Sequence, residues 1–236
     1  MKNAAFMKHA KKSQNFFDTL SGAFAPFTFC LVGVIILSAT IQEESMNKTA
    51  LIMIDMQQGF IDPSSPICIA GAAGTVPACA EAIRFFHEAK LPVFYAVRHY
   101  RADGSDVEKA RAKVWADGGK PLSEACDESM SDAFPEEFEV IDSDRIMIKP
   151  RFSAFFATSL DLVLRRLRVQ TVVLAGTTTP NCIRTTCYDA LSLDYDVVVL
   201  SNCTSSVTPE GQRANLEDMQ RIGAEIMTLD EIKNHG

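Results

Sequence analysis

Short apolar runs that alternate with helical segments are the feature that most constrains the fold of this chain. Ala50–Ile54 is apolar without interruption, which is typical of a strand buried on both faces of a parallel sheet. Further runs predict strands at Leu91–Val97, Arg145–Ile148, Thr171–Ala175, Asp196–Leu200 and Ala224–Met227. The alternation predicts an α/β fold, with a mainly parallel sheet of roughly six strands between layers of helices.

The segments between these runs divide into helices and loops. Helical spacing predicts helices at Thr75–Lys90, Thr158–Arg168, Cys182–Leu193 and Pro209–Ile222. Residues 61–74 and Asn202–Pro209 have the composition of loops. Residues 102–144 are polar and acidic, and a segment of that length within a compact domain predicts a functional loop or lid.

Composition excludes several classes of protein. A chain of 236 residues fits one α/β domain, or one domain with an extension. Its net charge of −7 and the lack of a long basic run argue against nucleic acid as a partner. The seven cysteines are scattered and form no C-x-x-C pair, so neither a zinc ribbon nor a disulfide framework is indicated. This cysteine usage suits a reducing compartment.

The first 46 residues differ from the rest, which leads us to expect a separate extension at 1–46 and a domain at 47–236. Four lysines precede an uncharged run at Thr19–Gln42, a pattern that resembles a signal peptide or a membrane anchor. Pro26 weakens the membrane-spanning interpretation, and Met46 is an alternative start. We expect a cytoplasmic domain whose chemistry does not depend on the extension. The alternative is export, or membrane anchoring through residues 19–42.

A cysteine follows the loop after the fourth apolar run. That run stops at Gly176, a turn-prone loop follows, and a helical segment begins near Cys182. Helix N-termini favour a thiolate, so Cys182 is a candidate nucleophile beside N–H groups able to stabilise an oxyanion. The alternative is a small buried hydrophobic residue, and the local sequence leaves both interpretations open.

Two other strands also end in charged residues. Asp55 follows the first run and Lys149 follows Arg145–Ile148. The alternatives are a turn carboxylate and a lysine that reaches water past the edge of the sheet. Since the carboxyl ends of parallel strands share one edge of a sheet, Asp55, Lys149 and Cys182 are predicted to converge there.

Three motifs around these residues resemble the isochorismatase-like cysteine hydrolases. The motifs are Ile52-Met-Ile-Asp-Met-Gln-Gln-Gly-Phe60, Ile148-Lys-Pro-Arg-Phe-Ser-Ala-Phe155, and Ala175-Gly-Thr-Thr-Thr-Pro-Asn-Cys182 with Thr185 and Asp189-Ala190. The resemblance covers about residues 49–229. It implies a Rossmann-like three-layer α/β/α sandwich, a catalytic triad of Asp55, Lys149 and Cys182, and no cofactor.

The resemblance also assigns roles to the loop before Cys182. It implies a cis peptide bond between Thr177 and Thr178, and an oxyanion hole formed by the backbone N–H groups of Thr178 and Cys182. Pro180 departs from many relatives and removes one backbone donor. Cys187 lies more than a helical turn further on and is interpreted as a packing residue.

Within the family, the motifs indicate a substrate class. Nicotinamidases carry an Asp-x-His metal motif that Arg98–Asp106 lacks, so no metal is predicted. Cys182–Thr186 and Arg98–Asp106 are most similar to biuret hydrolase and N-carbamoylsarcosine amidohydrolase. The prediction is a hydrolase that cleaves a C–N bond of a small amide, ureide or carbamoyl compound through a thioester. The alternatives are an isochorismatase or nicotinamidase-type hydrolase, or a non-catalytic relative that binds a small molecule.

The resemblance further implies a small pocket with an aromatic wall and a polar end. The predicted substrate-binding residues are Phe60, Phe152 and Phe155 for the wall, Arg98 and Arg184 for a carboxylate, and Gln212 for a carbonyl. A homo-oligomer, either a dimer or a tetramer, is implied by the resemblance alone.

Overall fold

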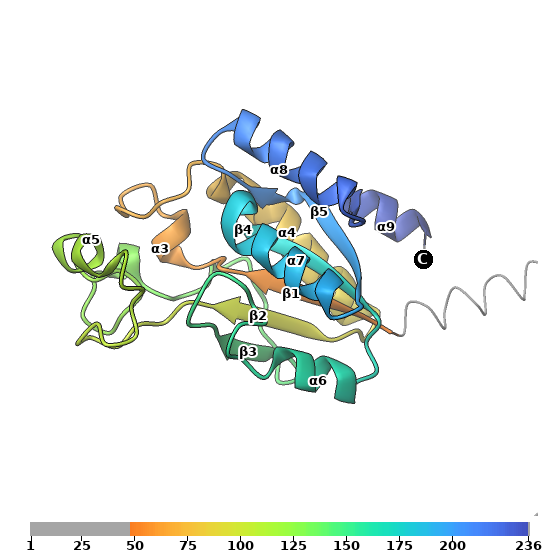
Figure 1. The fold of residues 1–236 in the computed structure, drawn as a ribbon, viewed down its shortest axis with the longest axis horizontal. Helices are drawn as coiled ribbons and strands as arrows, with labels where there is room; N and C mark the ends of the chain where they lie inside the picture. Colours follow the sequence, from red (N-terminus) through yellow and green to blue (C-terminus); the bar gives the residue numbers. More distant parts are fainter. Residues whose placement is uncertain (1–47, 236) are drawn as a thin grey trace, which may run out of the picture. The chain divides into compact units, whose positions relative to one another are not determined.

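The computed structural model describes residues 48–235 and shows an α/β fold (Figure 1). Its sheet has six strands in the order β3-β2-β1-β4-β5-β6, and every neighbouring pair is parallel. The strands are β1 (Thr49–Ile54), β2 (Val93–Val97), β3 (Arg145–Ile148), β4 (Thr171–Thr177), β5 (Asp196–Ser205) and β6 (Glu225–Met227). The predicted fold class is therefore confirmed, including the parallel sheet.

Helices cover both faces of the sheet, because alternate strand residues point to opposite sides. Leu51 and Met53 of β1 pack in one apolar cluster with residues of α4 and α9. Ala50, Ile52 and Ile54 pack in a second cluster with residues of α6, α7 and α8. The helices are α4 (Ala72–Glu88), α6 (Leu160–Arg166), α7 (Arg184–Ser192), α8 (Pro209–Arg221) and α9 (Leu229–His235).

Several elements differ from the sequence-based expectation. Strand β5 continues to Ser205 through residues that were expected to be a loop, because Thr204 and Ser205 pair with β4. The segment expected to be a loop or lid contains α5 (Ala112–Asp117) and the 3-10 turn η1 (Glu128–Met130). Helix α9 and the short helix α3 (Gln58–Ile61) were not predicted either.

The strand order reverses its direction of winding between β1 and β4, and such a point is where open α/β sheets bind ligands. The two strands approach closely there. Gly176 has φ +113°, and a Cβ at this position would lie 2.0 Å from the carbonyl oxygen of Ile54. Glycine is therefore required at Gly176, and the loop that follows β4 begins beside the end of β1.

The extension predicted at 1–46, with its possible signal or anchor at 19–42, lies outside the described residues. Within residues 48–235, no helix combines the length and the apolar character that crossing a bilayer requires.

Candidate active site

Asp55 and Lys149 meet at the carboxyl edge of the sheet. Asp55 directly follows β1 and Lys149 directly follows β3, and each residue is only 1% exposed. The Lys149 Nζ donates to Oδ2 of Asp55 at 2.8 Å and to the Arg151 carbonyl at 3.3 Å. Asp55 has φ 52°, a left-handed conformation that aspartate tolerates better than most residues. A buried ion pair is expensive to desolvate, so this one calls for a functional explanation.

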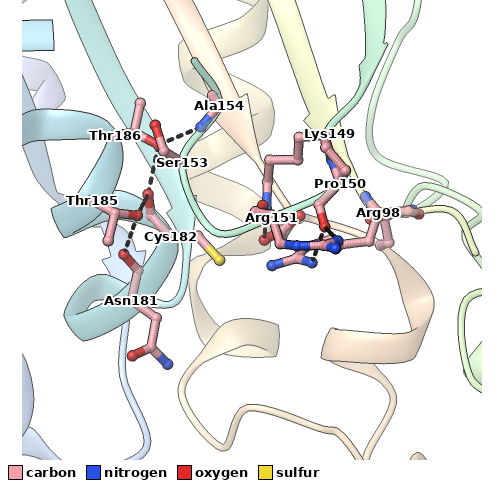
Figure 2. Close-up of polar contacts among 12 residues, drawn as sticks. Arg98, Lys149, Pro150, Arg151, Ser153, Ala154, Asn181, Cys182, Thr185 and Thr186 are labelled. Carbon is pink, nitrogen blue, oxygen red and sulfur yellow. Dashed lines mark hydrogen bonds and ion pairs between the residues drawn. The ribbon is translucent and has the colours of Figure 1, made fainter. Parts of the chain in front are cut away.

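The second oxygen of the Asp55 carboxylate, Oδ1, lacks a hydrogen bond of this kind in the described part of the chain. Among the described residues, Oδ1 is buried and has no hydrogen-bond partner. Figure 2 shows the sulfur of Cys182 pointing toward the side of the site where Lys149 and Arg98 lie. Asp55, Arg98 and Cys182 all line the same cavity. The carboxylate thus has one oxygen held by a lysine and one oxygen open to accept a proton.

Cys182 does not lie in the first turn of an α-helix, as was expected. It lies in a π-type turn, Thr179–Ile183, which precedes α7. The Ile183 N–H donates to the Thr178 carbonyl at 3.3 Å, which widens this turn by one residue. Pro180 occupies the start of the turn, where its missing N–H removes no bond within the turn.

The electrostatic environment of Cys182 also differs from the expectation of a thiolate. Burial and, next to it, the negative charge of Asp55 raise the pKa of the Cys182 thiol to about 11. The positive charges of Lys149 and Arg98 act in the opposite direction but do not outweigh burial. The expected lowering of the pKa by a helix N-terminus is therefore wrong, and the thiol is protonated at neutral pH.

Side-chain hydroxyls hold the loop between β4 and Cys182. Thr179 donates to the Ser205 carbonyl at 2.9 Å, and the Ser205 hydroxyl donates to Thr177 at 2.9 Å. Thr186 donates to the Cys182 carbonyl at 2.6 Å and accepts from the Ala154 N–H at 3.0 Å (Figure 2). The peptide bond between Thr177 and Thr178 is cis, at the position that the resemblance implies.

A cavity of about 480 Å³ opens in front of Cys182. Its volume falls within the range of roughly 300–1,000 Å³ that is usual for small-molecule sites. Of the predicted residues, the cavity is lined by Asp55, Phe60, Arg98, Phe152, Thr178 and Cys182. The loop or lid expected at 102–144 forms its outer wall, through residues that include Val107, Trp115 and Leu122.

Arg98 lies at the centre of a buried polar network. Its backbone exchanges two hydrogen bonds of 2.8 Å with the side chain of Gln57. Its Nη1 forms an ion pair with Glu108 and donates to the Tyr100 hydroxyl at 2.8 Å. Nη1 also contacts the carbonyl of Pro150, the residue after Lys149, at 3.4 Å (Figure 2). The charge of Arg98 is thus matched within the protein by Glu108.

Three predicted substrate-binding residues, Phe155, Arg184 and Gln212, are not among the residues that line this cavity. Phe155 stacks on Tyr195 within the core under α6 and α7. Arg184 forms an ion pair with Asp218 of α8 at 2.8 Å. The Gln212 Nε2 donates to the Thr204 hydroxyl at 3.0 Å. Each of these side chains has a partner inside the fold that the sequence did not reveal.

Sequence reasoning also missed residues that line the cavity. Tyr100 follows the strand predicted at Leu91–Val97, and Glu108, Arg111 and Trp115 come from the segment at 102–144 that was treated as an undivided loop. The only available signal was the spacing of Val107, Trp115 and Leu122, which form a small apolar cluster with Tyr100. Cys187 is fully buried in the core, as predicted, and burial raises the pKa of its thiol to about 12. Within residues 48–235, no three His, Cys, Asp or Glu side chains are grouped to hold a metal ion.

The fold and the site define an α/β protein with a buried cysteine, carboxylate and lysine at the carboxyl edge of its sheet. The family model described as isochorismatase domain matches residues 49–231. The chain belongs to this family, and the resemblance to the isochorismatase-like hydrolases is thereby confirmed.

Individual relatives cover most of the chain. A protein of Arabidopsis thaliana named probable inactive nicotinamidase is 35% identical over 191 residues, which are 80% of this chain and 96% of that protein. Maleamate amidohydrolase of Pseudomonas putida is 31% identical over 189 residues, covering 78% of this chain and 84% of that enzyme. The crystal structure of an isochorismatase family protein from Desulfovibrio vulgaris is 38% identical. It has a TM-score of 0.74 and covers 79% of this chain and 97% of its own.

Proposed function

We propose that the protein is a hydrolase that cleaves the C–N bond of a small amide, ureide or carbamoyl compound, with Cys182 as the nucleophile. The observation that carries this proposal is the buried Asp55–Lys149 pair beside Cys182, at the inner end of a cavity. A fully buried charge pair contributes little net stability. The presence of such a pair at the carboxyl edge of a parallel sheet therefore favours a catalytic role.

In the first half of the reaction, the Cys182 sulfur bonds to the carbonyl carbon while its proton passes to Oδ1 of Asp55. A neutral resting thiol requires such an acceptor, because its pKa is raised to about 11. The positive charge of Lys149 compensates the negative charge, which moves from the Asp55 carboxylate to the substrate oxygen and later returns to Asp55. The backbone N–H groups of Thr178 and Cys182 stabilise the oxyanion. One donor of this kind typically contributes about 2.7–4 kcal/mol of transition-state stabilisation.

In the second half, the tetrahedral intermediate collapses and the C–N bond breaks. The leaving amine or ammonia takes the proton from Asp55, and a thioester to Cys182 remains. A water molecule then attacks the thioester carbon and gives its proton to Asp55. The carbon–sulfur bond breaks, the proton returns to sulfur, and the acid product leaves. Asp55 therefore serves as base and acid in alternation.

The relatives support this reaction class. Maleamate amidohydrolase is named for the hydrolysis of an amide, and its similarity to this chain extends over the whole site region. The aromatic side chains of Phe60 and Phe152 line the cavity of this chain beside Cys182. They form an apolar wall for the body of the substrate, while Asp55 and the loop at Thr178 serve its reacting group.

A second candidate function is a non-catalytic relative that binds a small molecule. The observation that favours it is the name of the Arabidopsis relative, which describes a probable inactive nicotinamidase. The buried, protonated thiol of Cys182 is compatible with either candidate, so slow alkylation at neutral pH does not distinguish them. Turnover does.

Release of ammonia tests the proposal. Wild-type protein and Cys182→Ala are assayed with maleamate, biuret, N-carbamoyl amino acids and nicotinamide. Loss of Cys182 is expected to lower the turnover of any accepted substrate by roughly three or more orders of magnitude. Cys187→Ala is the matched control, because Cys187 is buried in the core away from the cavity, and it should retain activity. Equal turnover by Cys182→Ala and wild type would refute the mechanism.

A further inference from the structure

Among the described residues, one charged side chain of the cavity lining has no ion-pair partner. Its charged lining residues are Asp55, Arg98, Glu108 and Arg111. Asp55 is paired with Lys149, and Arg98 is paired with Glu108, both within the buried interior. Arg111 therefore supplies one positive charge that no neighbouring residue of the lining neutralises.

Arg111 lies immediately before α5, in the outer wall of the cavity. Its guanidinium carbon stands 5.0 Å from the centre of the Phe152 ring, a cation–π distance. The ion pairs found among residues 48–235 do not include Arg111. Arg111 is exposed, so its guanidinium is accessible to a ligand while it lies over the Phe152 ring.

Cys182 and Arg111 line the same cavity, together with a predominantly apolar set of side chains. Phe60, Trp115 and Leu122 belong to this set, and the Trp115 indole is fixed by its hydrogen bond of 2.8 Å to the Pro121 carbonyl. An apolar wall favours an apolar ligand body, and a lone guanidinium on the rim favours a carboxylate, which it can bind through two hydrogen bonds.

We propose that Arg111 binds a carboxylate of the substrate, and that the substrate is an amide or carbamoyl compound with an apolar body between its carboxylate and its reacting group. This inference rests on the proposed function, since Cys182 fixes the reacting end. It assigns the carboxylate to Arg111 instead of Arg98 or Arg184, because those two arginines are already paired with Glu108 and Asp218. The segment at 102–144 thereby determines specificity.

Binding to a non-reacting protein tests this inference apart from turnover. Calorimetry with Cys182→Ala compares 4-(ureidomethyl)benzoate, whose phenyl ring lies between its urea and its carboxylate, with benzylurea, which has the same urea and phenyl groups but no carboxylate. The acid should bind at least about tenfold more tightly, the difference expected for a hydrogen bond between charged groups. Adding Arg111→Gln should remove this preference, and adding Arg111→Lys should retain part of it.

Lys113→Gln is the matched control, because Lys113 belongs to α5 but pairs with Asp117 and does not line the cavity. It should leave the preference unchanged. The inference is overturned if Arg111→Gln keeps the preference, if the neutral urea binds as tightly as the acid, or if neither compound binds. Acid binding that depends on Arg111, without hydrolysis by the Cys182 protein, would refute the proposed function and leave the inference standing.

Discussion

At the scale of single residues, burial affects the Cys182 thiol in two opposing ways. Burial shields the Cys182 thiol from solvent but raises its pKa to about 11. Lys149 and Arg98 lower that pKa, yet both are partly neutralised by carboxylates, Asp55 and Glu108. The net result is a neutral thiol next to a carboxylate with an open oxygen. Activation by proton transfer during attack fits this arrangement better than a preformed thiolate.

The pH dependence of alkylation measures this property. Because the folded-state pKa is raised from 9.0 to about 11, the thiolate fraction at pH 7 is about a hundredfold lower than for a thiol at 9.0. The rate of Cys182 labelling by iodoacetamide should rise about tenfold per pH unit from pH 7 to 10. A small cysteine peptide, as the reference, should level off near pH 9. A rate for Cys182 that levels off below pH 9 would contradict the neutral resting thiol.

The candidate residues show what the sequence can and cannot predict at this scale. Asp55, Lys149 and Cys182 follow apolar strands, so their convergence was predictable from the geometry of a parallel sheet alone. Arg184 and Gln212 were predicted to bind a carboxylate and a carbonyl of the substrate, in the pocket that the resemblance implies. Their contacts with Asp218 and Thr204 depend on how α7 and α8 pack, which strand periodicity does not specify.

At the scale of elements, the β1–β4 contact positions the site. Ile54 and Gly176 are partners in the sheet, Asp55 follows Ile54, and the loop to Cys182 begins after Gly176. Ser205, at the end of β5, holds this loop through Thr177 and Thr179. Three neighbouring strands thus fix the loop before Cys182 relative to the Asp55 carboxylate.

Replacement of Gly176 tests this contact. Gly176→Ala would place a Cβ 2.0 Å from the Ile54 carbonyl oxygen at φ +113°, so backbone must move. We expect a loss of more than about 3 kcal/mol in the free energy of unfolding, measured with urea. Gly74→Ala is the control, since nothing lies within 4 Å of its Cβ in α4, and it should stabilise by about 0.5–1 kcal/mol. Similar effects of the two changes would contradict this account.

The elements also differ in how far they could be predicted. Apart from the second half of β5, the strands of the sheet and helices α4, α6, α7 and α8 were expected within a few residues, because their apolar patterns are continuous. Helix α5 was missed, since its only buried residue is Trp115 and one apolar side chain forms no periodic pattern. Helix α9 is short and largely polar, and it is fixed by Leu229 and Ile232 in the core.

At the scale of the whole molecule, β1 lies in the middle of the sheet, where it pairs with β2 on one side and β4 on the other. Every residue of β1 is buried, and Asp55 follows it directly. Just before β1, the Lys48 carbonyl accepts from the N–H groups of Gln170 at 2.7 Å and Thr171 at 3.1 Å. Lys48 and β1 themselves therefore supply contacts that hold this strand beside β4.

This arrangement predicts that a chain beginning at Met46 folds and retains the activity of the full chain. It keeps β1 and the Lys48 contacts, so its melting temperature should stay within about 2–4 °C, the shift that about 1 kcal/mol produces in a domain of this size. Thermal unfolding of both chains, followed by circular dichroism, measures this difference. A chain beginning at Met53 is the control, because it lacks Thr49–Ile52 of the central strand and should not fold cooperatively. Equal loss of folding in both shortened chains would show that residues before Met46 contribute to the domain after all.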